Sequence, residues 1–310
     1  MAALPAFQRT WVLIIGFVVL WNSGFIGAEY ALPFTEPLTL LLWRYWSLAI
    51  ILLVYLLARN RLKWPGWQAT SIAGLIGVLA HGTWLGCVFY SLEYGVPSGI
   101  VALVVALQPM TTGLFSGMVA GERTPPIRWI GLLIGFGGVM IAVTTRMEFS
   151  DPDSIFAYLI PFGSVAAITV ASLIQRRLHV KSHDYSLPVD LGLFYQSMGV
   201  ALAVSIPAIL FEGLATEWTP LFLGGLAWLT LVVSLGAYGL MWILIERIDA
   251  TRVASLFYFG PPVTMLMAWL AFDDGLLPTD IIGLGVIAAG VGLAQMKLSS
   301  PATETGIIRE

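Results

Sequence analysis

The segment LTLLLWRYWSLAIILLVYLLA, residues 38–58, contains one charged side chain, Arg44, and is otherwise almost entirely apolar. An α-helix needs about 20 such residues to cross the hydrocarbon core of a bilayer. Lipid offers no partner to peptide groups, so a segment of this kind spans a membrane as a helix whose hydrogen bonds are internal. The sequence therefore predicts a membrane-spanning helix here.

Nine more stretches of the same kind extend along the chain of 310 residues, of which 58% are hydrophobic and 11% are charged. A soluble domain carries about 25% charged residues, so a soluble fold is excluded. The runs are continuous, unlike the alternating strands of about 10 residues in a membrane barrel. We expect an all-α integral membrane protein with ten transmembrane helices, at Thr10–Tyr30, Leu38–Ala58, Gly66–Leu92, Pro97–Ala120, Pro126–Thr145, Ile155–Ile174, Pro188–Phe211, Thr219–Ile245, Ala250–Phe272 and Pro278–Met296.

The positive charges fall on alternate sides of these stretches. Of the 15 Lys and Arg residues, thirteen lie in the tails and loops of one side, Arg146 lies on the other side, and Arg44 lies within a helix. The positive-inside rule then places both termini in the cytoplasm. We expect a multi-pass membrane protein with short loops on both sides.

The two halves of the chain resemble each other. Features 152 residues apart coincide, and they include Pro109 with Pro261, Gly131 with Gly283 and Gly138 with Gly290. Each half then holds five helices, and because five is odd, the second half enters the membrane inverted. Inverted repeats are typical of secondary transporters, which bind substrate between the repeats near the bilayer midplane. We predict repeats at residues 1–149 and 150–298, and a flexible cytoplasmic tail at 299–310.

Several motifs resemble the EamA repeat of the drug/metabolite transporter superfamily. In the first half they are Ser98–Leu103, Leu107–Pro109, Gly121–Arg123 and Trp129–Gly131, and in the second half Val253–Ser255, Gly260–Pro262 and Ile282–Gly283. The second copy departs from the pattern with Asp273-Asp274 in place of Gly-Glu. The aromatic-rich segment His81–Tyr90 of the third helix is most similar to bacterial aromatic amino-acid exporters of the YddG type. The resemblance implies ten helices, a central cavity and export of amino acids across the inner membrane.

Polar and aromatic side chains at mid-span depth are the candidates for binding substrate, since such groups are costly in lipid unless they face a cavity or the bundle interior. The candidates are Trp21, Asn22, His81, Trp84, Tyr90, Gln108, Ser164, Tyr195, Ser234, Tyr238 and Tyr258.

His81 and Asn22 each allow two interpretations. The His81 imidazole either binds substrate or carries a proton in the cavity, or it bonds to a neighbouring helix. His81, Trp84 and Val88 share one helical face, which we expect to line the cavity. The Asn22 amide suits a zwitterion, because it both donates and accepts hydrogen bonds, and it equally suits a contact between helices.

Arg44 is the one basic residue well inside a predicted span. It either attracts an anionic substrate or takes a structural role, snorkelling towards the acidic loops or pairing with Glu36. We favour the structural role.

Prolines and glycines indicate where helices are expected to kink or to pack closely. Pro109 and the pair Pro261-Pro262 are expected to kink helices four and nine at matching depths, as gating positions. The glycines of helices five and ten favour tight packing or dimer contact. These glycines are Gly131, Gly135, Gly137, Gly138, Gly283, Gly285, Gly290 and Gly292.

These features favour a secondary transporter that exports amino acids and related small metabolites by alternating access through a central cavity. The chain has one cysteine, no phosphate-binding Gly-Lys-Ser/Thr loop and no zinc motif, so we predict no enzyme activity, metal, cofactor or nucleic-acid partner. Ten helices can enclose a cavity in a monomer. The alternatives are a carrier of other metabolites or drugs, of the nucleotide-sugar or sugar-phosphate type, and a non-transporting membrane enzyme or scaffold.

Overall fold

The computed structural model describes residues 6–96, 98–145, 155–181, 185–273 and 275–296. Within these ranges the chain is helical, without a β-strand, and ten helices are long and apolar enough to cross a membrane. This result confirms the predicted all-α fold with ten spans. The predicted tail at 299–310 lies outside the described residues.

Six of the spans run through their middle as continuous α-helix. They are α1 (Ala6–Ala31), α2 (Pro37–Ala58), α7 (Pro126–Thr144), α8 (Ile160–Lys181), α9 (Val189–Pro207) and α14 (Pro278–Gln295). The sixth span reaches Val180, beyond the predicted end at Ile174. The apolar run stops there, but the polar last turns stay helical, and Arg176 in them pairs with Glu122.

The other four spans are interrupted near their middle. The third consists of α3 (Trp67–Gly77), a π-helical segment (Val78–Thr83) and α4 (Trp84–Glu93), and the eighth of α10 (Pro220–Ala227), a π-helical segment (Trp228–Ala237) and α11 (Tyr238–Arg247). The fourth is divided into α5 (Ser98–Val105) and α6 (Gln108–Val119), and the ninth into α12 (Ala250–Ser255), a 3₁₀ turn (Leu256–Phe259) and α13 (Gly260–Phe272).

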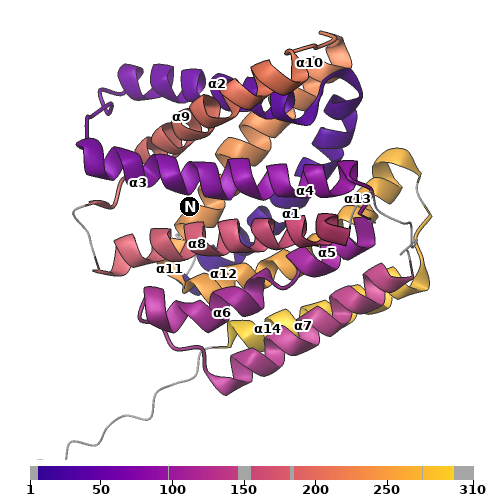
Figure 1. Cartoon of the computed structure of the whole chain (residues 1–310). Coiled ribbons are helices and arrows are strands. Elements are labelled where there is room, and N and C mark those ends of the chain that lie inside the picture. The colour runs from indigo at the N-terminus through magenta and orange to yellow at the C-terminus, as the bar shows by residue number, and fades with distance from the viewer. Residues whose placement is uncertain (1–5, 97, 146–154, 182–184, 274, 297–310) are drawn as a thin grey trace, which may run out of the picture.

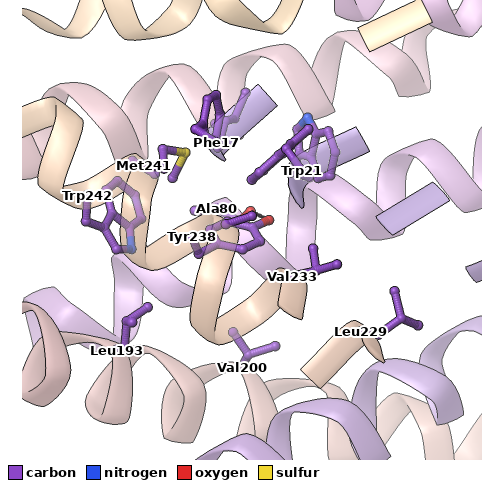
Figure 2. Packing of buried hydrophobic residues seen from close by; sticks show 14 of the residues in the cluster. Phe17, Trp21, Ala80, Leu193, Val200, Leu229, Val233, Tyr238, Met241 and Trp242 are labelled. Carbon is purple, nitrogen blue, oxygen red and sulfur yellow. Dashed lines mark hydrogen bonds between the residues drawn. The ribbon is translucent and has the colours of Figure 1, made fainter. Parts of the chain in front are cut away.

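The spans lie side by side in one bundle (Figure 1). Helices α7 and α14 lie together along one edge, and α2 and α9 pack together at the opposite edge. Between these edges, large side chains fill the interior. Figure 2 shows Phe17, Trp21, Tyr238, Met241 and Trp242 converging from α1 and α11, all of them buried.

Glycines allow the backbones of α7 and α14 to approach closely. A Cβ atom on Gly131 would lie 2.6 Å from the carbonyl oxygen of Gly290, and one on Gly138 would lie 2.8 Å from the backbone nitrogen of Ile287. Gly137, Gly285 and Gly292 face open space instead. In lipid, where apolar surface gains little by leaving the solvent, such close packing of small residues holds helices together. Tight packing within the chain therefore accounts for part of the predicted glycine set.

We predict that Gly138→Ala destabilises the protein, whereas Gly137→Ala, one residue away, does not. Overpacking at Gly138 costs about 1–3 kcal/mol, which exceeds the gain of up to about 1 kcal/mol from replacing a helical glycine. The measurement is the melting temperature of each purified variant in detergent. An equal melting temperature for both variants would contradict the close approach of α7 and α14.

Candidate functional site

A cavity of about 420 Å³ opens between the helices. Its walls come from α1, α2, α4, α5, α7, α11 and α13, together with the π-helical segment before α11 and the 3₁₀ turn before α13. Pockets for small molecules have volumes of about 300–1,000 Å³ and mostly apolar walls. The size therefore suits a solute such as an amino acid.

The cavity occupies one half of the bundle. It is lined by the second half of α1, from Trp21 to Ala28, by the first turns of α2, from Leu40 to Arg44, and by α4 from Trp84 to Phe89. These segments all lie towards the end of the bundle where α1 passes into α2. In the opposite half of the bundle, the pocket beside Gln175 and Trp242 has a volume of about 20 Å³.

Aromatic rings form the deepest wall of the cavity. The Trp21 ring lies 5.5 Å from Trp84, 4.7 Å from Tyr238 and 4.8 Å from Phe257, measured between ring centroids. All four residues line the cavity. Tilted and edge-on pairs at these distances are favourable for aromatic rings. Of the residues predicted to bind substrate, Trp21, Trp84 and Tyr238 are brought together here, as Figure 2 shows for Trp21 and Tyr238.

Arg44 also lines the cavity, and the predicted pairing with Glu36 is wrong. The Arg44 side chain is buried, with the residue 5% exposed, and its Nε donates a hydrogen bond of 2.6 Å to Ser234 Oγ. Its Nη2 atom has no hydrogen-bond partner among the described residues, nor does Arg44 form an ion pair with any of them. Glu36 is exposed at the start of α2. The cavity wall therefore includes a guanidinium group without an ion-pair partner among the described residues.

His81 does not line the cavity, although its predicted neighbours Trp84 and Val88 do. It lies in the π-helical segment Val78–Thr83, whose wider turn shifts the register of the helical face. Its ring lies 3.8 Å from that of Tyr238, and its Nε2 is 3.3 Å from Gln196 Oε1. The contact with a neighbouring helix is therefore the interpretation of His81 that the geometry favours.

The other candidates lie outside the cavity wall. Asn22 accepts a hydrogen bond from Thr264, which does line the cavity. Gln108 donates to Thr112, and the Tyr195 hydroxyl donates to the Lys63 carbonyl near the end of the span. Tyr90 is partly buried against the hydrophobic core. Ser164 and Tyr258 are buried and have hydroxyl oxygens without a hydrogen-bond partner among the described residues.

The prolines begin half-helices rather than kinking continuous ones. Pro109 lies in the first turn of α6, and Pro261 and Pro262 lie in the first turn of α13. At this position the missing N–H has no helical partner in any case, so proline is well tolerated. Pro261 also lines the cavity. The prediction of kinks is corrected to breaks in the helices at these prolines.

Cavity residues that sequence reasoning missed include Thr264 and Phe257. Thr264 follows Pro261 by three residues, so helical spacing from the predicted gating proline was a signal for it. Phe257 is one residue before the candidate Tyr258, on the 3₁₀ turn Leu256–Phe259. That turn directs Phe257 to the cavity, and its geometry is not readable from periodicity.

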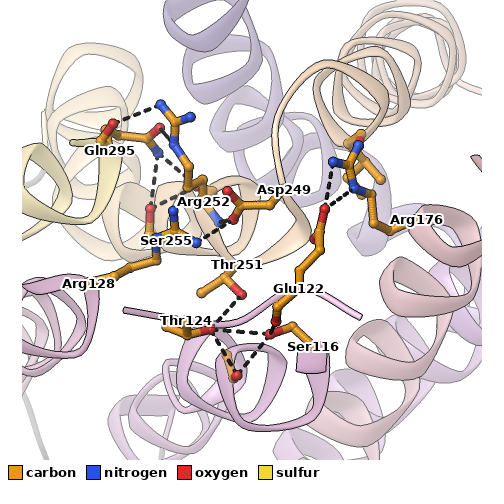
Figure 3. A network of polar contacts seen from close by, with 12 residues as sticks. Ser116, Glu122, Thr124, Arg128, Arg176, Asp249, Thr251, Arg252, Ser255 and Gln295 are labelled. Atoms are coloured by element: carbon orange, nitrogen blue, oxygen red, sulfur yellow. Dashed lines mark hydrogen bonds and ion pairs between the residues drawn. The ribbon is translucent and has the colours of Figure 1, made fainter. Parts of the chain in front are cut away.

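A polar network joins segments far apart in the sequence at the opposite end of the bundle (Figure 3). Glu122, after α6, forms an ion pair of 2.6 Å with Arg176 of α8. Arg128 of α7 forms one of 2.9 Å with Asp249, whose carboxylate also accepts from the first turn of α12. The Arg176 guanidinium also donates to the carbonyl of Ile245 at the end of α11. These contacts tie the two halves of the chain together on the side away from the cavity.

Comparison with known proteins places these features among transporters. Residues 9–144 match the EamA-like transporter family. The chain is 28% identical over 295 residues to YedA, an uncharacterized inner membrane transporter of Escherichia coli (strain K12), covering 94% of this chain and 91% of YedA. It is 20% identical to a probable amino-acid metabolite efflux pump of the same strain, covering 92% of this chain and 94% of the pump.

Two further similarities agree. The chain is 23% identical to the uncharacterized transporter YvbV of Bacillus subtilis (strain 168), covering 96% and 94% of the two chains. A crystal structure with 19% sequence identity superposes with a TM-score of 0.75, covering 93% of this chain and 97% of that one. The fold is therefore one already seen in an experimental structure.

We predict that Asp249→Ala lowers the melting temperature more than Asp249→Asn does. Both substitutions remove the charge paired with Arg128, but asparagine keeps an acceptor for the backbone N–H of Arg252, which is worth about 1 kcal/mol as a helix cap. Asp190→Asn serves as the control, because Asp190 pairs with the half-exposed Arg61 and exposed pairs contribute little. Equal melting temperatures for the two Asp249 variants would contradict the capping role.

Proposed function

We propose that this chain, which belongs to the EamA-like transporter family of the drug/metabolite transporter superfamily, is a secondary transporter that exports amino acids and related small metabolites by alternating access. The observation that carries the proposal is a solute-sized cavity confined to one half of the bundle, with a packed and ion-paired other half. In alternating access, the closed half must open as the open half closes.

The backbone around the cavity supports such a movement. Segments that line the cavity belong to the interrupted spans three, four, eight and nine. Irregular backbone is tolerated in a membrane where it lines a cavity or is covered by protein, and discontinuous helices form the substrate sites of many secondary transporters. The gating role that we propose for Pro109, Pro261 and Pro262 lies at these interruptions.

Two inverted repeats, residues 1–149 and 150–298, remain our proposal for the internal organisation. The starts of α6 and α13, at Gln108 and Gly260, are 152 residues apart, as are the related prolines. If Gly131 corresponds to Gly283 and Gly138 to Gly290, then the close approach of Gly131 to Gly290 corresponds to that of Gly283 to Gly138. Both approaches are present. Reciprocal contacts of this kind are what a two-fold axis between the repeats requires.

We propose the inner membrane of a bacterium as the location, with both termini in the cytoplasm. The relative YedA is an inner membrane transporter, and the charge asymmetry of the loops supports this orientation. The polar network then lies on the cytoplasmic side, and the cavity lies in the outer half of the membrane.

Amino acids and related metabolites are the proposed substrates. A relative is a probable amino-acid metabolite efflux pump, and the aromatic and aliphatic walls suit small solutes with an apolar part. Nucleotide sugars and sugar phosphates are weaker candidates. Phosphate recognition favours several arginines or lysines, and Arg44 is the one charged residue among the described residues that line the cavity.

The test is exchange of radiolabelled amino acids by the purified protein in proteoliposomes loaded with unlabelled amino acid. We expect saturable exchange by the wild type and a loss of at least about tenfold in Ala102→Trp, which fills the cavity. Leu133→Trp, on a side chain 60% exposed on the bundle surface, should exchange like the wild type. The tenfold loss corresponds to about 1.4 kcal/mol, within the cost of overpacking.

Two results would overturn the proposal. Exchange that is equal in Ala102→Trp and the wild type would remove the cavity from the transport path. Absence of exchange for every amino acid and metabolite tested, with a folded wild-type protein, would remove the proposed substrates.

A further inference from the structure

We infer that the Arg44 guanidinium binds the carboxylate of the transported solute, and that the cavity selects carboxylates with an apolar body whether or not they carry an amino group. This inference rests on the proposed transport function and specifies its substrate class. It assigns to Arg44 the binding role rather than the structural role that the sequence favoured.

The first step concerns the charge, burial and partners of the Arg44 side chain. A guanidinium carries five N–H donors and stays charged in proteins. This one is 5% exposed, inside a membrane span, and the described residues supply it with a neutral hydroxyl, Ser234 Oγ, and with no carboxylate. A charge buried in this way is costly unless it is paired. A substrate carboxylate in the cavity that Arg44 lines would supply the missing counter-charge.

The second step is the position of the charge. Arg44 lines the cavity, as does the neighbouring Tyr238 side chain. The bond from Nε to Ser234 fixes one edge of the planar group, so the Nη nitrogens are held in place before a ligand arrives. Arginine in a fixed orientation suits planar carboxylates, which accept two parallel hydrogen bonds.

The third step is the chemistry of the remaining wall. Neither aspartate nor glutamate is among the described residues that line the cavity. An ammonium group would therefore meet no counter-charge from the wall, only the faces of aromatic rings such as Trp21 and Trp84, which attract cations weakly. The wall offers strong recognition to the carboxylate and little to the amine. A deaminated acid should consequently bind about as well as the matching amino acid.

The fourth step connects binding to movement. Arg44 belongs to α2 in the first half of the chain, and Ser234 belongs to the π-helical segment before α11 in the second half. A carboxylate on Arg44 therefore lies where the halves meet, the place at which solute binding can influence their relative position.

The experiment compares matched ligands on the full-length purified protein, with binding followed by quenching of tryptophan fluorescence and checked by calorimetry. The ligands are L-phenylalanine, 3-phenylpropanoate, 3-phenylpropanamide, phenethylamine and phenyl phosphate. We expect the two carboxylates to bind with similar affinity, and the amide and the amine to bind roughly 30-fold more weakly or worse, as for the loss of one partner of a buried charge pair. Phenyl phosphate, which bears a second charge without a partner, should also bind more weakly.

Variants of the protein complete the test. Arg44→Gln should lose the preference for acid over amide, Arg44→Lys should retain part of it, and Arg61→Gln, outside the cavity, should retain all of it. If Arg44→Gln fails to fold, then Ser234→Ala replaces it, since releasing Nε should weaken carboxylate binding and leave binding of the amide unchanged.

The outcomes separate this inference from the proposed function. Equal binding of acid and amide to the wild type, or an unchanged preference in the Arg44→Gln and Ser234→Ala variants, would overturn the inference while amino-acid exchange still supports transport. Tighter binding of phenyl phosphate would overturn the assignment to carboxylates. Absence of both binding and exchange for all these ligands would overturn the inference together with the proposed substrates.

Discussion

Lipid offers no hydrogen-bond partner to a peptide group, and this constraint determines where the helices of the protein can be interrupted. Four spans depart from α-helical geometry near their middle, and segments of all four border the cavity. The freed backbone groups find partners inside the protein. The Tyr238 hydroxyl, for example, donates to the carbonyl of Ala80 within the π-helical segment of the third span. Irregular backbone is therefore found in the spans that border the cavity, where the protein interior supplies partners for its polar groups.

Much of the fold was predictable, because the apolar runs and their loops require ten helices. The depth of a residue within its span correctly selected Trp21, Trp84 and Tyr238 for the cavity. Depth alone does not reveal which way a side chain faces. His81 does not line the cavity, because a π-helical turn shifts the face of the third span. The hydrogen bond of Arg44 to Ser234 was not predictable, because the two residues lie 190 positions apart in the sequence. The repeat boundaries and the orientation in the membrane stay predictions.

The structure combines one tightly packed contact, between α7 and α14, with side-chain ion pairs that can separate. The glycine contacts between α7 and α14 bring backbone against backbone, and such packing changes little without a large loss of contact. The ion pairs of Glu122 and Asp249 are different, since they join side chains rather than backbones, and water can take the place of a partner once the side chains separate. We therefore place the moving contacts at the polar network and the stationary ones at the pair of helices α7 and α14.

In the proposed mechanism, the region around Arg44 both binds the solute and lies where the two halves of the chain move relative to each other. We propose that the mostly apolar cavity selects solutes by size and that the Arg44 guanidinium orients them. We expect a buried cation without an ion-pair partner among the described residues to repel other cations and to leave an empty cavity less stable than an occupied one. In this proposal, the Arg44 charge selects carboxylate solutes and also favours the conformational change that transports the bound solute.

Thiol accessibility tests alternating access most directly. In a Cys87→Ser background, Ala102→Cys places one thiol in the cavity wall, and Arg61→Cys, in a separate variant, places one near the end of α2 as a reference for orientation. Each is treated with a membrane-impermeant maleimide in right-side-out and inside-out vesicles. We predict modification of the Ala102→Cys variant in both kinds of vesicle, with protection by substrate, and modification of the Arg61→Cys variant in inside-out vesicles alone. Modification of the cavity thiol from one side only, in a variant that still transports, would contradict alternating access through this cavity.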